Sequence, residues 1–165
     1  MKNIYWIRHA GLSRLAIVAR PRGDDRLDDD LRALKRDGID IVLSALTRPE
    51  AEELGLEKES ERAGAVGLDF ISYPIPDGET PQDLSSFRKL ISQLVNAIQA
   101  GKGVGVHCRG CIGRSTIVAA SVLMELGFTA QRALDMIEQS RECMVPDTVE
   151  QRDWIQRYEP SGSAR

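Results

Sequence analysis

The stretch HCRGCIGRS, residues His107 to Ser115, decides the fold, because it joins an expected strand directly to an expected helix. The short run GVGVH that leads into it is typical of a buried strand, and STIVAASVLMEL is helical as far as Gly127. A strand that turns into a helix leaves the amides between them without regular partners, and the helix N-terminus adds partial positive charge. The sequence therefore predicts a cradle for a phosphate-like dianion in this stretch.

The residues of this stretch suit nucleophilic chemistry on a bound phosphate. Gly110 and Gly113 are expected to adopt the positive backbone angles that let successive N–H groups point to one centre. Arg114 adds a planar guanidinium that matches two phosphate oxygens, and the same positive field is expected to favour the thiolate of Cys108, the nucleophile. The expected phosphate-binding residues are Arg109, Gly110, Cys111, Ile112, Gly113 and Arg114.

Five residues separate Cys108 from Arg114, and a hydroxyl residue, Ser115, follows at once. This spacing resembles the signature of the protein tyrosine phosphatase superfamily, and His107 also matches the position before the cysteine. The resemblance implies that Cys108 forms a phosphocysteine intermediate and that Arg114 binds the phosphate. It also implies that Ser115 helps the thiolate to leave.

A general acid is needed as well, because a tyrosine or serine oxygen leaves poorly without a proton. The superfamily places an aspartate on a mobile loop roughly thirty residues before the cysteine. Asp77, in the proline-rich segment PIPDGETP, lies 31 residues before Cys108. Asp69 and Asp83 compete for this role, but the loop position favours Asp77. The resemblance further places Gln151 near the water that completes hydrolysis.

The segment PIPDGETP and the helix after it resemble the compact dual-specificity branch, particularly the kinase-associated phosphatases. The resemblance runs from about Leu15 to Tyr158. It implies a protein phosphatase that acts on phosphotyrosine in a phosphorylated protein, with phosphoserine and phosphothreonine left open. The loop lacks the extra lysines that are typical of phosphoinositide-selective members, which makes lipid substrates less expected.

Two other classes of function stay open at this point. Rhodanese-like sulfurtransferases and arsenate reductases also use a cysteine in an anion-binding loop, but a persulfide carrier needs no acid such as Asp77. A pseudophosphatase that only binds phosphate is disfavoured by the intact Cys108, Arg114 and Ser115. Cys111 either traps an oxidised Cys108 as a disulfide or is a neutral residue of the loop.

The rest of the chain predicts a three-layer α/β domain with a central, mostly parallel sheet flanked by helices. Residues 15–20 and 39–45 look like buried strands, and Leu27, Leu31 and Leu34 recur at helical spacing between them. Further expected elements are a strand at 68–73 and helices at 81–100, 129–140 and 148–158.

Two short helices are expected between the second and third of these strands. A capping box of Thr47 and Glu50 opens the first, and residues 57–62 form a solvated helix. Neither carries a chemical signal. We expect one domain over residues 1–159 and a flexible tail over residues 160–165.

Composition argues against several kinds of partner and location. The chain has 165 residues, of which 22 are basic and 25 acidic, so its formal charge of −3 offers no footprint for nucleic acid or an anionic membrane. The first apolar run is too short for a signal peptide, and three cysteines do not fit a secreted disulfide framework. Aspartates between positions 24 and 30 fit a solvated helix start better than a metal cluster. We expect a cytoplasmic protein without metal or cofactor and favour a monomer.

Overall fold

Five strands form one sheet in the order β1-β2-β5-β3-β4. The computed structural model describes residues 2–9, 12 and 14–161. The strands are β1 (Ile4–Trp6), β2 (Leu15–Val18), β3 (Ile41–Ser44), β4 (Asp69–Ser72) and β5 (Val104–His107). All neighbours run parallel except β1, which pairs antiparallel with β2 at the edge. The mostly parallel sheet is confirmed, but β1 was not predicted, because so short a strand carries too little pattern.

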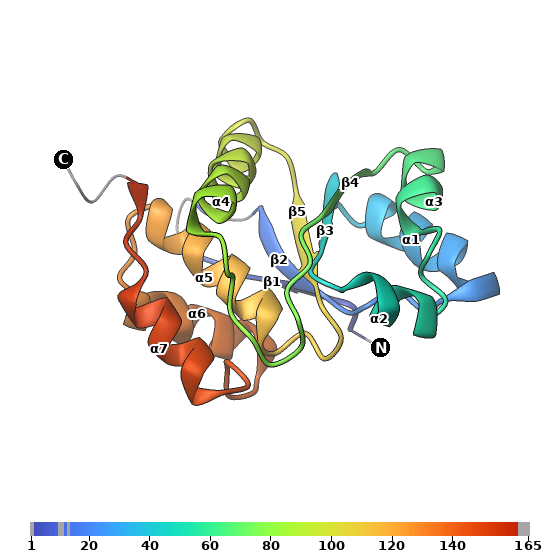
Figure 1. Cartoon of the computed structure of the whole chain (residues 1–165). Coiled ribbons are helices and arrows are strands. Elements are labelled where there is room, and N and C mark those ends of the chain that lie inside the picture. Colours follow the sequence, from blue (N-terminus) through green and yellow to red (C-terminus); the bar gives the residue numbers. More distant parts are fainter. Residues whose placement is uncertain (1, 10–11, 13, 162–165) are drawn as a thin grey trace.

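Helices cover both faces of the sheet (Figure 1). One side carries η1 (Asp24–Arg26), α1 (Leu27–Arg36), α2 (Arg48–Glu53) and α3 (Glu59–Ala65). The other side carries α4 (Leu84–Gln99), α5 (Arg114–Glu125), α6 (Ala130–Arg141) and α7 (Val149–Arg157). The predicted three-layer architecture is therefore confirmed. Residues 162–165 of the expected tail lie outside the described residues, within which no helix is long and apolar enough to cross a bilayer.

Each face of the sheet has its own hydrophobic core. Leu15 and Ile17 of β2 belong to the core beneath α4–α7, and Ala16 and Val18 belong to the core beneath α1 and α3. Every residue of β2, β3 and β5 is buried. This burial explains why these strands appear in the sequence as short continuous apolar runs rather than as alternating patterns.

α5 is the central helix of its layer. All of its residues from Arg114 to Met124 are buried, and it packs against α4, α6, α7 and the sheet. A helix that is apolar on all sides is stable only where other elements surround it. Because α5 begins directly after the loop that follows β5, its burial fixes the helix N-terminus at the carboxyl end of the sheet.

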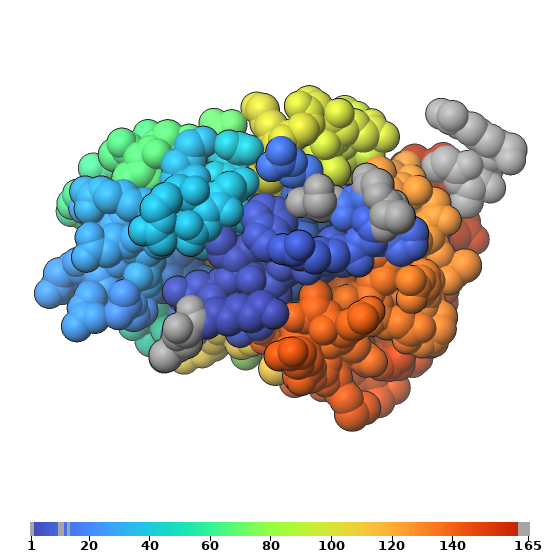
Figure 2. Space-filling model, turned by 180° about the vertical axis from the view of Figure 1, so that it is seen from behind, coloured from blue at the N-terminus to red at the C-terminus, as the bar shows by residue number. Residues whose placement is uncertain are grey.

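The edge strand β1 lies at the surface. In Figure 2 the N-terminal residues, in dark blue, cross the middle of this face between α1 in light blue and α6 in orange. All residues of β1 are half-buried. Arg141 of α6 covers the ring of Tyr5 at 4.2 Å, on the α6 side of the strand. Ile4 and Trp6 point to the opposite face and pack at the margin of the core beneath α1.

Candidate active site

Residues 108–113, which connect β5 to α5, form the floor of a cavity of about 240 Å³. We call this connection the phosphate loop. The cavity is lined by Cys108, Arg109, Gly110, Ile112, Gly113 and Arg114, together with Asp77 and Asp147. Gly113 is the N-cap of α5 and provides no side-chain cap, so the first amides of the helix can bind an anion. The structure thus brings the expected phosphate-binding residues together, except that Cys111 lies behind the cavity wall.

Two arginines hold the phosphate loop from outside. Nη1 of Arg20 donates to the carbonyl of Arg109 at 3.0 Å, and Nε of Arg141 donates to the carbonyl of Cys111 at 3.1 Å. The carbonyl and the following N–H of one peptide plane point in opposite directions. The N–H groups that follow these two carbonyls are therefore turned away from the arginines.

The sulfur of Cys108 lies at the base of the cavity in a residue that is only 2% exposed. The N–H of Cys111 donates to this sulfur at 3.2 Å, and Oγ of Ser115 lies 3.4 Å from it. Hydrogen bonding by the Cys111 side chain lowers the pKa of the Cys108 thiol well below its ordinary value and outweighs burial, which raises it. Ser115 and the charge of Arg114 lower this pKa further. The thiolate, the nucleophilic form, is therefore favoured.

The backbone of the phosphate loop differs from the expectation. The positive φ, of 57°, falls on Cys111, and neither Gly110 nor Gly113 adopts one. Gly113 is needed for space, because a Cβ there would lie 2.6 Å from Oε1 of Gln151. A Cβ on Gly110 would meet no described atom within 4 Å. The prediction of two conformational glycines was wrong, because the sequence does not show which residue must leave room for α7.

Arg114 is buried, with 1% of its side chain exposed, and both of its terminal nitrogens are bonded. Nη1 and Nη2 each donate to one carboxylate oxygen of Glu50 at 2.8 Å. Nη1 also donates to the carbonyl of Ile75 at 2.8 Å, and Nη2 donates to Oδ1 of Asp77 at 3.1 Å. These contacts hold the guanidinium in one orientation at the edge of the cavity.

Glu50 belongs to the site, although the sequence did not reveal it. It forms the expected capping box of α2 with Thr47, and the same carboxylate is the two-pronged partner of Arg114. Burial raises the pKa of Glu50, but hydrogen bonds from Arg114 and Thr47 outweigh it and lower the pKa from 4.5 to about 2. The expectation that α2 carries no chemical signal was wrong. The available signal was position, since Glu50 follows β3 at the same sheet edge as Cys108.

Asp77 is the competing aspartate that the structure brings to the cavity. Its side chain is 65% exposed, and its Oδ1 contacts Arg114. Asp83 is instead the N-cap of α4, where its side chain accepts from two backbone amides. Asp69 begins β4 and so lies at the opposite edge of the parallel sheet.

Gln151 lies beside the phosphate loop and is 1% exposed. Its side chain completes the capping box of α7 with Thr148. Nε2 of Gln151 donates to the carbonyl of Glu79, in the segment that also carries Asp77, at 3.1 Å. Gln151 therefore links α7, the segment that carries Asp77, and the phosphate loop. Its expected role at the hydrolytic water stays a prediction.

A second residue that the sequence did not reveal lies behind Cys108. Nε2 of His107, which is fully buried, lies 2.7 Å from Oε1 of Glu59, which is 3% exposed. Nδ1 of the same imidazole lies 3.4 Å from the carbonyl of Cys108. A wholly solvated helix at residues 57–62 was therefore a wrong prediction. A run of charged residues does not show which one turns inward to a buried partner.

Cys111, like Cys108, carries a free and buried thiol, and it does not line the cavity. Its Sγ donates to the carbonyl of Val18 at 3.1 Å. Hydrogen bonding to Cys108, followed by burial, raises the pKa of the Cys111 thiol well above its ordinary value. The two sulfurs are thus tuned in opposite directions. A disulfide between them stays a prediction.

A favoured thiolate and a buried guanidinium, both at the carboxyl end of the central strand of an α/β sheet, are typical of the cysteine-dependent phosphatases. Comparison with known proteins agrees. The model of the family described as "Polymorphic toxin system, DSP-PTPase phosphatase" matches residues 16–128. The chain belongs to this family, within the compact dual-specificity branch of the tyrosine phosphatases.

Two curated proteins are similar to this chain over part of its length. Cyclin-dependent kinase inhibitor 3 of Rattus norvegicus is 28% identical over 134 residues, which are 80% of this chain and 63% of that protein. Protein tyrosine phosphatase PRL-1 of Leishmania major is 33% identical over 100 residues, which are 56% of each chain. The chain therefore matches less than two thirds of the length of the first relative.

Solved structures show the same fold. Kinase associated phosphatase, with its catalytic-site cysteine replaced by serine, superposes with a TM-score of 0.80 at 22% identity, over 93% of this chain and 90% of that one. PTPMT1 in complex with PI(5)P superposes with a TM-score of 0.75 at 16% identity, over 94% of this chain and 93% of that one. The predicted phosphatase fold is confirmed.

Gly113→Ala and Gly110→Ala test which glycine of the phosphate loop is needed for space. We expect Gly113→Ala to lower the free energy of unfolding by about 1–3 kcal/mol, because the added methyl group collides with Gln151. Gly110→Ala should leave it nearly unchanged. Urea unfolding of both variants measures the difference, and equal losses would contradict the assignment.

Glu59→Ala tests the buried contact behind Cys108. We expect a loss of about 1–3 kcal/mol in the free energy of unfolding, because removing one member of a buried hydrogen-bonded pair leaves the other without its partner. Glu59→Gln should lose less, since an amide can still bond the imidazole. Glu61→Ala, at an exposed position of the same helix, is the control. A Glu59→Ala variant as stable as the control would show that the contact contributes nothing.

Glu50→Gln tests the carboxylate that holds Arg114. Folding lowers the pKa of Glu50 from 4.5 to about 2, so its ionised form stabilises the folded state above pH 4.5 and this stabilisation is lost as the pH falls toward 2. We expect the stability gap between wild type and Glu50→Gln, about 3 kcal/mol at pH 7, to shrink over that range. Denaturation at several pH values measures the gap, with the exposed Glu52→Gln as control. A constant gap would refute the linkage.

Proposed function

We propose that this chain is a cysteine-dependent protein phosphatase that hydrolyses phosphotyrosine in proteins, with phosphoserine and phosphothreonine as further substrates. One observation carries the proposal: the sulfur of Cys108, the guanidinium of Arg114 and the carboxylate of Asp77 line the same cavity. Membership of the DSP-PTPase family supports this reaction. Nothing in the comparisons favours persulfide transfer, arsenate reduction or phosphate binding without catalysis.

In the proposed first step, the Cys108 thiolate attacks phosphorus and forms a sulfur–phosphorus bond. The bond from phosphorus to the tyrosyl oxygen breaks, and that oxygen takes the proton of Asp77. The loop amides and Arg114 stabilise the charge on the transferring group, because they are already oriented before the substrate arrives.

In the second step, water attacks the phosphocysteine and phosphate leaves. Asp77, now ionised, takes a proton from this water, and Gln151 is the proposed water-positioning residue. The sulfur–phosphorus bond breaks and returns the thiolate to Cys108. Oγ of Ser115, at 3.4 Å, donates a hydrogen bond to the departing sulfur.

The contact between Asp77 and Arg114 fits a change of partner during the cycle. Both a phosphate dianion and the Asp77 carboxylate compete for the same guanidinium, which keeps its two bonds to Glu50. We propose that a bound phosphate replaces Asp77 at Arg114. The exposed Asp77 side chain can then turn to the leaving oxygen.

A phosphorylated protein is the proposed substrate. Relatives named as a protein tyrosine phosphatase and a kinase associated phosphatase support this class. PTPMT1 was solved with PI(5)P, so lipid phosphates are the competing class. In the phosphate loop of this chain, the cationic side chain before Arg114 is that of Arg109, and it already pairs with Glu53 at 3.0 Å. The loop also has no lysine, and both features favour a protein substrate over a lipid phosphate. A cytoplasmic location, a monomeric state and independence from cofactors stay predictions.

Two variants test the mechanism. Cys108→Ser should abolish hydrolysis of both phosphotyrosine and p-nitrophenyl phosphate, because the hydroxyl is not a competent nucleophile. Asp77→Asn should lower kcat on phosphotyrosine about 10²–10⁴-fold. It should lower kcat on p-nitrophenyl phosphate far less, since nitrophenolate leaves without a proton. Steady-state kinetics on both substrates measures the difference.

Asp147→Asn is the matched control, because Asp147 lines the same cavity. It should change kcat on phosphotyrosine and on p-nitrophenyl phosphate by the same factor. Equal losses for Asp77→Asn would assign the acid to another residue, and hydrolysis that survives Cys108→Ser would refute the mechanism. Parallel assays on phosphoserine, phosphothreonine and inositol phosphates then rank the substrate classes.

A further inference from the structure

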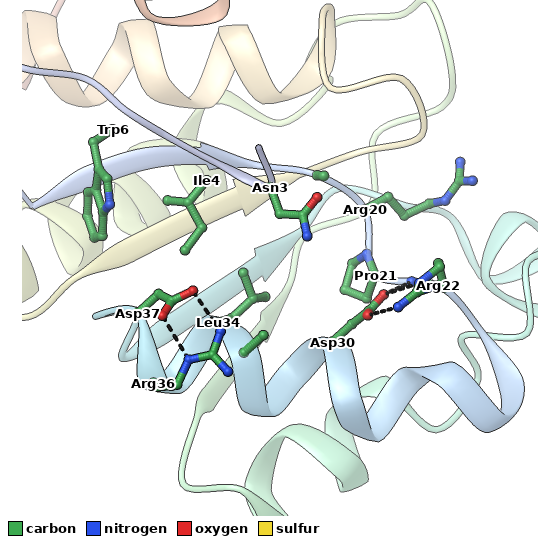
Figure 3. A pocket seen from close by; sticks show the side chains of 12 residues that line it. Asn3, Ile4, Trp6, Arg20, Pro21, Arg22, Asp30, Leu34, Arg36 and Asp37 are labelled. Atoms are coloured by element: carbon green, nitrogen blue, oxygen red, sulfur yellow. Dashed lines mark hydrogen bonds and ion pairs between the residues drawn. The ribbon is translucent and has the colours of Figure 1, made fainter. Parts of the chain in front are cut away.

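A second and larger cavity, of about 660 Å³, lies between the edge strand β1 and helix α1. We call it the edge groove. Its apolar lining includes Ile4 and Trp6 from β1 and Leu34 from α1. Figure 3 shows Ile4 and Trp6 on the strand side of this groove and Leu34 on the helix side. The proposed reaction uses none of these residues.

β1 offers a free main-chain edge along this groove. The N–H of Ile7 donates to β2 at 2.9 Å, and the carbonyl of Asn3 accepts from the residue after β2 at 2.8 Å. In an antiparallel pair, the alternate residues point their N–H and C=O groups away from the partner strand. In β1 these are Ile4 and Trp6, and within the described ranges no hydrogen bond reaches their outward groups. An extended segment can therefore pair with β1 as a further strand.

The rim of the edge groove presents positive charge to solvent. Arg22 pairs with Asp30 at 2.7 Å, and Arg36 pairs with Asp37 at 3.0 Å (Figure 3). In both pairs the arginine is the more exposed side chain, at 59% against 18% and at 73% against 50%. Arg20 adds a third guanidinium to the lining. This charge distribution fits an acidic segment better than a basic one.

The edge groove reaches the outer side of the phosphate loop at Arg20. Arg20 lines the groove, and its Nη1 donates to the carbonyl of Arg109 in the phosphate loop. Because β2 runs parallel to β5, the residues after β2 lie at the same sheet edge as Cys108. The chain of a substrate bound at the phosphate loop can therefore continue past Arg20 and run along β1.

We propose that the edge groove docks an extended, acidic segment of the phosphoprotein substrate, outside the phosphorylated residue, which pairs with β1. The proposal rests on the proposed phosphatase activity and names the kind of substrate that it acts on. The strand of 3 residues offers about 10 Å of edge at ~3.3 Å per residue, enough for a segment of about three to five residues. Linking this contact to the phosphate contact raises the affinity for long substrates only.

The test compares two synthetic peptides. Each carries phosphotyrosine and a Gly-Ser linker, followed either by a tail of alternating valine and glutamate or by more Gly-Ser, and each is made in both chain directions. We expect the acidic tail to raise kcat/KM of the wild type about fivefold or more in one direction. Hydrolysis of p-nitrophenyl phosphate, which is too small to reach the groove, is the internal reference.

Variants at one position separate groove binding from catalysis. Ile4→Glu should remove the gain from the tail, because it places negative charge in the groove. Ile4→Lys should retain it, since the lysine stem still covers apolar surface. Arg32→Gln, which makes the same charge change as Ile4→Glu at an exposed position of α1, should also retain it. All three should hydrolyse p-nitrophenyl phosphate like the wild type.

Amide hydrogen exchange gives a readout that needs no activity. Adding the unphosphorylated acidic-tail peptide should slow exchange at the N–H groups of Ile4 and Trp6, and the Gly-Ser peptide should not. If the tail protects these N–H groups in a protein that hydrolyses no phosphate ester, docking at the edge groove is supported and the proposed phosphatase activity is refuted. Hydrolysis of both peptides at equal rates, with no protection, would overturn the groove alone. Protection that depends only on protein concentration, with a dimer in sedimentation, would assign β1 to a second copy of the chain.

Discussion

The buried guanidinium of Arg114 imposes the constraint on which the rest of the site depends. A positive charge with 1% of its side chain exposed is stable only if its N–H groups find partners, because water cannot solvate it. Glu50 supplies two carboxylate oxygens, and Ile75 supplies a carbonyl. These partners come from α2 and from the segment after β4. The hydrogen bonds of the Arg114 guanidinium therefore hold α5, α2 and that segment together. The cavity forms where those parts meet.

The same contacts leave the site prepared for an anion. Compared with a well-packed apolar pair, a buried ion pair adds little net stability, because the loss of hydration offsets most of the attraction, although removing one partner alone is costly. Its value at this position is orientation. The guanidinium, the outward-bonded carbonyls of the phosphate loop and the uncapped N-terminus of α5 are all fixed before a phosphate binds. Preorganised groups of this kind need no rearrangement when charge develops in the transition state.

Most of the fold, the phosphate loop and the position of Asp77 could be predicted from the pattern of neighbouring residues in the sequence. The run of strand, loop and helix around Cys108 predicted the phosphate loop, and the proline-rich segment predicted where Asp77 lies. Glu50 and Glu59 escaped notice, because their importance comes from partners at positions 114 and 107, far along the chain. Cys111 adopts the positive φ that was expected of its glycine neighbours. Gly113 is needed instead because Gln151 approaches it closely, and that contact depends on the tertiary structure.

The sequence by itself determined the order of most elements, the phosphatase class and the mostly parallel sheet, because each depends on residue types at short spacing. Only the tertiary structure decided which carboxylates face Arg114 and His107, which glycine must leave room and which strand edge stays open. Those choices depend on burial, where one unpaired charge or one overlapping methyl group costs as much as many local preferences together. No window of neighbouring residues contains that information.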